Sequence, residues 1–290
     1  MGIIVRVQLK KMIMSSVCVV HLVWDKLGFE PFKRFIESYG KNAGGWPHDL
    51  LIIFQGHFKE NGLAGYYDLL KPYSYHCMFR PNQGFDLSAY REAARKFNFD
   101  YFCFLNSYSV LLDENWLAKM HRYFTENDVG MVGATGSWES PYSISLLCPD
   151  DKQRPLHKRL LYKYWWKLWQ YIYRFQFDPF PNYHIRTNAF MISRSLFNKI
   201  KGTCFYNKAS TVRFECGRNS LSKQIMRIGL RLLVVGKDGV AHEKEDWARS
   251  NTFRQGAQDN LLVADNRTAQ YINSDSDQRK RLSRITWGYL

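Results

Sequence analysis

Residues 101–116 read YFCFLNSYSVLLDENW, and this stretch carries the pattern that decides the fold. The apolar run from Tyr101 to Leu105 leads directly into a polar turn at Asn106-Ser107-Tyr108. A helical pattern begins at Trp116, a few residues later. Ligands of open α/β sheets bind at the carboxyl ends of the strands, so we expect this turn to lie in a binding site.

The same alternation of apolar runs and helical patterns continues along most of the chain. Strand-like runs occur at 17–24, 49–54, 75–79, 101–105, 129–134, 189–192 and 232–235. Helical patterns occur at 29–39, 66–71, 87–97, 116–124 and 220–228. This order predicts an α/β fold with a mostly parallel central sheet and helices on both faces. The loops after Trp24, Gln55, Phe79 and Leu105 are then expected along one edge, as the predicted cleft.

The composition indicates a folded protein with an anionic partner. The 290 residues are 46% apolar and 23% charged, and the formal net charge is +15. Such a charge favours a nucleotide diphosphate, an anionic membrane surface or nucleic acid as the partner. No nucleic-acid-binding motif is recognisable, so nucleic acid is the weakest of these three and we expect none to be bound.

The cysteines and the apolar runs bear on the compartment. The six cysteines lack Cys-x-x-Cys spacing, which indicates buried, reduced thiols of a cytoplasmic protein rather than a zinc site. No window of 18 or more residues is continuously apolar, so no membrane-spanning helix is predicted. We interpret residues 1–15 as a leader and expect them to be poorly ordered.

A resemblance to a known family follows from these motifs. The turn at 106–108, preceded by Gly84-Phe-Asp86-Leu-Ser-Ala-Tyr90, resembles the core of a family 2-type glycosyltransferase with the GT-A fold. The resemblance spans roughly residues 16–245. It implies inverting transfer of a sugar from a nucleotide-diphospho-sugar to a glycan or lipid-linked acceptor, in cell-surface polysaccharide biosynthesis.

The chain departs from that family at one important place. Members carry an Asp-x-Asp motif where this chain has Asn106-Ser107-Tyr108, and the two aspartates hold a divalent cation on the donor diphosphate. Asn106 and Tyr108 can donate hydrogen bonds to phosphate, but neither is a hard anionic ligand. Three interpretations stay open: transfer without a metal, a manganese or magnesium ion held by other residues, or a non-catalytic relative that only binds nucleotide or glycan.

The resemblance also assigns the donor side of the cleft. The residues it implies are Trp24, Gln55, Asp86, Asn106, Tyr108 and Arg254. Trp24 and Gln55 end the first two strands and would flank the base and ribose. Asp86 has a second interpretation as a helix N-cap that accepts hydrogen bonds from free amides near Ser88 and Ala89.

On the acceptor side, Glu215 occupies the place where family members carry the catalytic base. A structural ion pair of Glu215 with Arg213 or Arg218 is the alternative. The candidate acceptor contacts are Arg186, Thr187, Asn188 and Arg218. The arginines at 186, 218 and 254 would also supply the positive charge that a missing metal leaves unprovided.

Residues 152–177 form a basic aromatic segment with no acidic residue between Lys152 and Phe177. On a helix, Lys163, Lys167, Gln170 and Arg174 form a polar stripe, and Leu161, Trp165, Leu168 and Ile172 form an apolar one. This pattern favours peripheral attachment to the inner face of an anionic membrane, with an ordinary docked helix as the alternative. The predicted organisation is a single domain over 16–270 with 152–177 as an insertion, followed by a polar tail over 271–290.

Overall fold

The computed structural model describes residues 15–59, 62–147, 156–202 and 207–288. Within α6, side chains are described from residue 164 onward. The predicted leader, apart from Ser15, and the first residues of the 152–177 insertion therefore lie outside the described residues.

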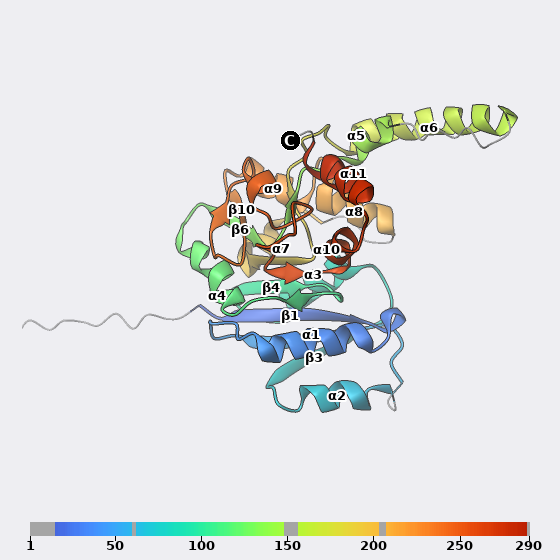
Figure 1. The fold of residues 1–290 in the computed structure, drawn as a ribbon. Helices are drawn as coiled ribbons and strands as arrows, with labels where there is room; N and C mark the ends of the chain where they lie inside the picture. Colours follow the sequence, from blue (N-terminus) through green and yellow to red (C-terminus); the bar gives the residue numbers. More distant parts are fainter. Residues whose placement is uncertain (1–14, 60–61, 148–155, 203–206, 289–290) are drawn as a thin grey trace, which may run out of the picture.

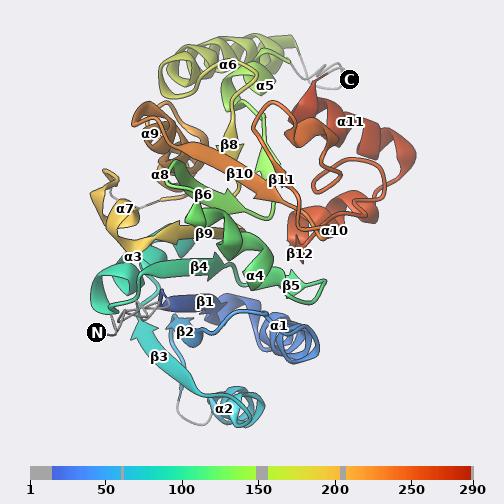
Figure 2. The same ribbon diagram turned by 90° about the vertical axis from the view of Figure 1, so that its left-hand side faces the viewer.

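An eight-stranded sheet organises the chain, in the order β11-β10-β6-β9-β4-β1-β2-β3 (Figures 1 and 2). Its strands are β1 Val17–Trp24, β2 Asp49–Gln55, β3 Tyr75–Arg80, β4 Tyr101–Leu105, β6 Val129–Gly133, β9 Ala189–Ser193, β10 Arg231–Val235 and β11 Ala241–His242. The pairs β4·β1, β1·β2, β2·β3 and β10·β6 are parallel, whereas β9 runs antiparallel to both of its neighbours and β11 runs antiparallel to β10. The mostly parallel α/β sheet predicted from the sequence is thus confirmed.

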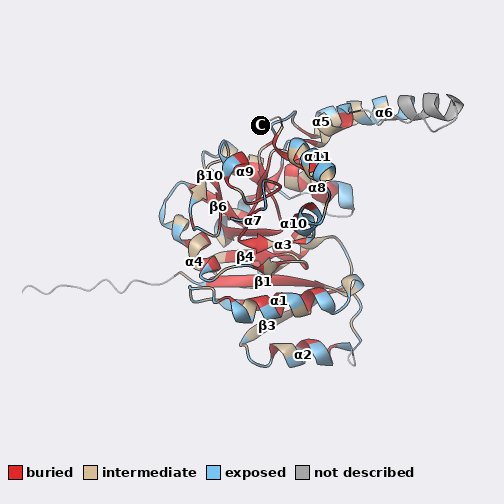
Figure 3. Ribbon diagram, viewed as in Figure 1, coloured by how far each residue is buried: buried red, intermediate tan, exposed pale blue. Residues whose placement is uncertain are grey.

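Helices cover both faces of this sheet, as predicted. They are α1 Glu30–Lys41, α2 Ala64–Leu70, α3 Asp86–Lys96, α4 Trp116–His121, α5 Pro141–Leu146, α6 Leu156–Gln176, α7 Arg194–Lys199, α8 Lys208–Cys216, α9 Leu221–Arg227, α10 Asn266–Ile272 and α11 Ser276–Trp287. Successive side chains of a strand point to opposite faces. Val20 of β1 therefore packs in the core beneath α3, α7, α8 and α9, and its neighbour Val19 packs in the core beneath α1, α2 and α4. Figure 3 shows the buried strands between these two layers.

Two short sheets bring distant segments together. β5 (Val110–Leu111) pairs antiparallel with β12 (Val263–Ala264), and β7 (Gly136–Ser137) pairs antiparallel with β8 (His184–Ile185). The first pairing is the one that matters for the site, because it places the start of α10 beside the turn after β4.

Residues 271–290 differ from the polar tail that the sequence predicts. Most of them form α11, and Trp287 at its end is only 2% exposed. The indole Nε1 of Trp287 donates to the Phe253 carbonyl at 2.8 Å, and its ring meets Trp138 edge-on at 5.4 Å. Leu282, Thr286 and Trp287 of this helix are buried although most of its residues are polar, so composition alone does not reveal its contact with the core.

α6 extends away from the body of the molecule (Figure 1). Its Gln170, expected on a solvent-facing polar stripe, instead donates from Nε2 to the Ser145 carbonyl of α5 at 2.7 Å. Trp165 and Leu168 of the expected apolar stripe are 55% and 41% exposed. The helix is therefore docked on α5 through Gln170, and Trp165 and Leu168 of its apolar stripe remain uncovered.

Candidate functional site

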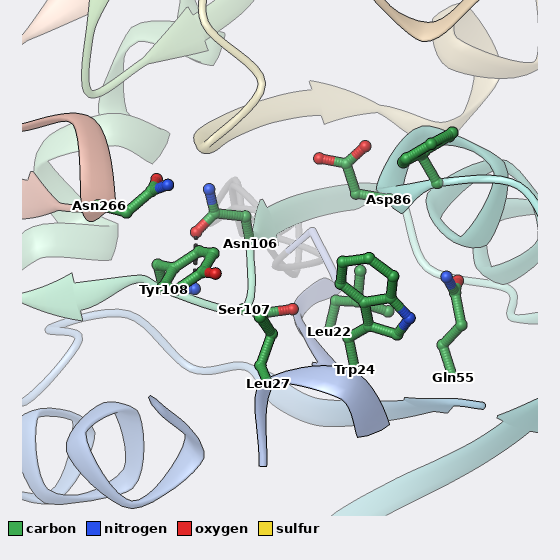
Figure 4. Close-up of a pocket in the computed structure, with 10 residues that line it drawn as sticks. Leu22, Trp24, Leu27, Gln55, Asp86, Asn106, Ser107, Tyr108 and Asn266 are labelled. Carbon is green, nitrogen blue, oxygen red and sulfur yellow. Dashed lines mark hydrogen bonds between the residues drawn. The ribbon is translucent and has the colours of Figure 1, made fainter. Parts of the chain in front are cut away.

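A cavity of about 180 Å³ opens at the carboxyl ends of β1, β2 and β4 (Figure 4). It is lined by Leu22, Trp24, Leu27, Gln55, Phe85, Asp86, Asn106, Ser107, Tyr108 and Asn266. All the predicted donor contacts except Arg254 are among these residues. The parallel strands bring them together because their carboxyl ends meet at one edge of the sheet.

The turn after β4 presents hydrogen-bond donors to this cavity. The Asn106 side-chain oxygen Oδ1 accepts from the Tyr108 amide at 3.0 Å and from the Ser109 hydroxyl at 3.2 Å. The Asn106 amide donates to the Asn188 carbonyl of the loop before β9 at 2.8 Å. Because its oxygen is engaged inside the turn, Asn106 offers its Nδ2 donor to a ligand, which suits a phosphate oxygen.

A divalent cation does not fit these residues. Asp86 contributes the one carboxylate among the lining residues, and the Asn106 oxygen is already used within the turn. Within the described ranges, no cluster of three or more His, Cys, Asp or Glu side chains could hold a metal ion. Magnesium and manganese prefer several hard oxygen ligands, so the lining side chains by themselves are a poor site for either ion.

Two lining side chains are held in place by neighbours outside the cavity. The Gln55 Oε1 atom accepts from Arg80 Nη1 at 2.6 Å, and Arg80 is itself paired with Glu92 at 3.2 Å. Trp24 Nε1 donates to the Asn82 side chain at 3.0 Å. Side chains fixed in this way lose little conformational entropy when a ligand arrives.

Lys26 and Asn266 are two groups near the cavity that the sequence analysis misses. The Lys26 ammonium lies 5.5 Å from the centre of the ring of Trp24, which lines the cavity. Asn266 arrives through the β5–β12 pairing, in which Val110 lies opposite Ala264. The capping pattern around Asp265 could have located the start of a helix, but nothing in the sequence links that helix to the turn at 106–108.

Asp86 is the acidic group of the cavity, and it does not act as the predicted N-cap. It is the first residue of α3, and the Ser88 and Ala89 amides donate to the Phe85 carbonyl instead. Its own Oδ1 accepts from the adjacent Leu87 amide, at 2.9 Å. Burial, followed by the negative charge of Glu215, raises the pKa of the Asp86 carboxyl to about 7.

This raised pKa predicts a pH-dependent cost to stability. An unfolded chain ionises Asp86 near 3.8, whereas the folded protein ionises it near 7, so the free energy of unfolding should fall as the pH rises between these values. Asp86→Asn removes the cost. After discounting for solvent screening, the free energy of unfolding of the variant should exceed that of the wild type by on the order of 1 kcal/mol above pH 7 in urea unfolding, and the two should match well below pH 3.8. The exposed Asp246→Asn is the control, and an equal difference at every pH would contradict the prediction.

Glu215, the predicted base, lies near the end of α8 and is held by Thr187. One carboxylate oxygen, Oε1, accepts from both the Thr187 amide and the Thr187 hydroxyl, each at 3.1 Å. Within the described part of the chain, neither Arg213 nor Arg218 forms an ion pair with it, which removes the structural alternative. Arg218 lies 3.5 Å from Asp178 instead, and its side chain is half exposed. Glu215 is thus oriented through Oε1, and no hydrogen bond from the described residues engages Oε2.

The predicted arginines do not gather at the cavity. Arg186 pairs with Asp265 at 2.7 Å and lies 4.0 Å from the Phe253 ring centre. Arg254 pairs with Glu139 at 2.5 Å and is buried. A buried guanidinium needs a carboxylate partner because desolvation is costly. These two arginines therefore hold the loops around the site in place. They do not supply the positive charge that the sequence leads us to expect in place of a metal ion.

Asn188 links Thr135 to the turn that follows β4. Its Oδ1 accepts from the Thr135 hydroxyl at 2.7 Å, and its carbonyl accepts from Asn106 and Ser109. Thr187 contacts Glu215 directly. Of the four predicted acceptor contacts, Thr187 and Asn188 thus touch other candidate site residues, and Arg186 and Arg218 point their charges elsewhere.

Comparisons with known proteins give structural likenesses only. No family model and no curated protein matches the sequence. A mannosyltransferase from Pyrobaculum calidifontis, in complex with GDP-Man and Mn²⁺, is similar with a TM-score of 0.45 and 9% identity over 81% of this chain. The chain spans 59% of that structure. Residues 1–349 of S. aureus TarS are similar with a TM-score of 0.47 and 10% identity, covering 93% of this chain and 70% of that one. Likeness at this level carries no conclusion about chemistry.

Proposed function

We propose that the protein transfers a sugar from a nucleotide-diphospho-sugar to a glycan or lipid-linked acceptor. Two observations carry the proposal. Side chains from the ends of three strands and the start of α3 line one cavity. Thr187 orients the carboxylate of Glu215, whose charge acts on Asp86 of that lining. The cavity of about 180 Å³ is smaller than most ligand sites, so it would enclose only part of the donor.

The chemistry that we assign uses this chain's own residues. Glu215 takes the proton of the acceptor hydroxyl as that oxygen attacks the anomeric carbon, and the sugar–phosphate bond breaks on the opposite side, which inverts the configuration. The leaving diphosphate accepts a hydrogen bond from the side-chain Nδ2 of Asn106 and interacts with the Lys26 ammonium. Donors fixed before the reaction stabilise developing charge at little reorganisation cost.

A second candidate function is binding without transfer. It is favoured by the absence of an acidic pair at 106–108 and by the poor fit of a divalent cation. The two functions differ in one measurable respect: a binding protein would hold the nucleotide sugar without releasing nucleotide diphosphate when acceptor is supplied. Cell-surface polysaccharide assembly is the process that we propose for the transferase.

Nucleotide binding tests the cavity directly. In isothermal titration against a panel of nucleoside diphosphates, at least one should saturate a single site without added manganese. Trp24→Ala should weaken that binding by about tenfold or more, because loss of an aromatic stacking face costs roughly 1–3 kcal/mol. Trp169→Ala, a change at a tryptophan on exposed α6, is the matched control and should bind like the wild type. Failure of every nucleotide to bind would remove the proposal.

We further propose that α6 attaches the protein to an anionic membrane, at its cytoplasmic face. At about 100° per residue, the exposed apolar side chains fall within one arc of about 160°. They are Tyr164, Trp165, Leu168, Trp169, Tyr171 and Phe175. Lys167 and Arg174 lie beside that arc, and both are exposed. No helix among the described residues is long and apolar enough to cross a bilayer, so attachment would be peripheral.

Flotation with liposomes containing anionic lipid tests this attachment. Each basic residue near such a surface contributes about 1 kcal/mol, so Lys167→Glu combined with Arg174→Glu should weaken binding at least tenfold. Lys199→Glu combined with Lys201→Glu changes the net charge equally at exposed positions outside α6 and should leave binding nearly unchanged. Equal losses in the two double variants would show a dependence on net charge alone and contradict a role for α6.

A further inference from the structure

A second cavity, of about 640 Å³, lies where α5, α6 and α11 meet. Its lining consists of Ser140, Ser143, Ile144, Leu147, Trp166, Phe180, Arg281, Arg284, Ile285 and Gly288. The volume falls within the range of about 300–1,000 Å³ that is usual for small-molecule sites. None of these residues belongs to the cavity at the strand ends, so the two cavities are separate.

The lining combines a hydrocarbon-like wall with positive charge. Ile144, Leu147, Trp166, Phe180 and Ile285 supply apolar side chains. Both charged residues of the lining are arginines on α11, and no lining residue is acidic. A guanidinium recognises phosphate through paired N–H donors, whereas an apolar wall favours alkyl chains. An amphiphile with one anionic head and one hydrocarbon chain matches both features.

The cavity is also continuous with the exposed arc of α6. Trp166 lines the cavity, and Trp169 lies one turn further along the same helix and is 52% exposed. Leu147 at the end of α5 lines the cavity and is 63% exposed, beside Leu146 at 52%. An apolar path therefore leads from the surface that would contact the bilayer into the cavity.

We propose that this cavity binds a single anionic phospholipid drawn from the bilayer, with one of its two hydrocarbon chains among the apolar side chains and its phosphate at Arg281 and Arg284. This proposal rests on the membrane attachment that we assign to α6. The protein would then hold one lipid in a discrete, saturable site, in addition to the contact between the surface of α6 and the bilayer. The bound lipid would fix the angle at which the protein meets the membrane.

Titration with monomeric lysophosphatidylglycerol, below its micelle concentration, tests the site without a bilayer. The wild type should bind one lipid saturably, and zwitterionic lysophosphatidylcholine of the same chain length should bind about tenfold more weakly. Arg281→Glu should weaken lysophosphatidylglycerol binding by about tenfold or more, whereas Lys280→Glu, the same charge change at the preceding residue, should not. Ile285→Trp should weaken it by filling the cavity, with Ile272→Trp as the exposed control on α10.

The other outcomes overturn the proposal. Absence of saturable binding by the wild type would mean that another part of this chain or a second copy fills the cavity, or that it stays empty. If Arg281→Glu and Lys280→Glu weakened lipid binding equally, the binding would depend on net charge and not on a specific contact with Arg281. The Lys167 and Arg174 double variant should retain monomer binding while losing liposome binding. Nucleotide titration of the same samples separates failure of this site from failure of the proposed transferase.

Discussion

Glu215→Gln is expected to lower sugar transfer by about 10²–10⁴-fold while leaving nucleotide binding unchanged. Glutamine keeps the size of the side chain and an oxygen that can accept from Thr187, as Oε1 does at 3.1 Å in the folded protein. It cannot take up a proton at that position. The measurement is release of nucleotide diphosphate with acceptor present, alongside titration of the nucleotide alone.

The control for this variant is Glu114→Gln, which removes an exposed carboxylate outside the site. A Glu215→Gln protein that retained half of the wild-type rate would exclude Glu215 as the base. Asp86 would then be the remaining acidic candidate, because its pKa of about 7 suits proton transfer near neutral pH. The pH dependence of the rate in Asp86→Asn would decide between them.

Trp287→Ala is expected to destabilise the protein by about 3–5 kcal/mol, the usual cost of deleting a large buried aromatic side chain. Trp287 is 2% exposed, packs against Trp138 and donates to the Phe253 carbonyl. Its loss would leave a cavity and an unpaired carbonyl between α11 and the loop that carries Arg254. Urea denaturation followed by circular dichroism measures the change.

The exposed Trp165→Ala is the matched control and should change the free energy of unfolding by no more than about 0.5 kcal/mol. If Trp287→Ala also stayed within about 1 kcal/mol of the wild type, the segment 271–288 would not be an integral part of the domain. The segment would then contribute little to the free energy of unfolding, as expected of a polar tail and not of a packed helix.

Most of the sheet could be predicted because its strands are apolar runs bounded by polar turns. Val17–Trp24 and Tyr101–Leu105 were located from local sequence, since a buried parallel strand must be apolar on both faces. The direction of β9 could not be read in this way. A central strand has the same composition whether its neighbours run parallel or antiparallel to it, and only the path of the connecting chain decides.

The charged residues show where sequence reasoning fails. The family resemblance implies that Arg186 lies on the acceptor side of the cleft and Arg254 on the donor side. In the structure each finds a carboxylate, Asp265 or Glu139, from a segment at least 79 residues away in the chain. Which buried charges form a pair depends on which residues are close in the folded protein, and a single sequence does not show that proximity.

Local sequence patterns predict the α/β sheet, the edge where the cavity lies, and the place of Trp24, Gln55, Asn106 and Tyr108 along that edge, because a strand end fixes where its next residues point. The family resemblance assigns Asp86 to the same edge. Three features depend on the folded molecule: Thr187 orients Glu215, Asn266 reaches the cavity through β12, and α6 leaves Trp165 and Trp169 uncovered. Each of these depends on contacts between segments far apart in the chain, and burial and pairing across such distances are properties of the folded molecule.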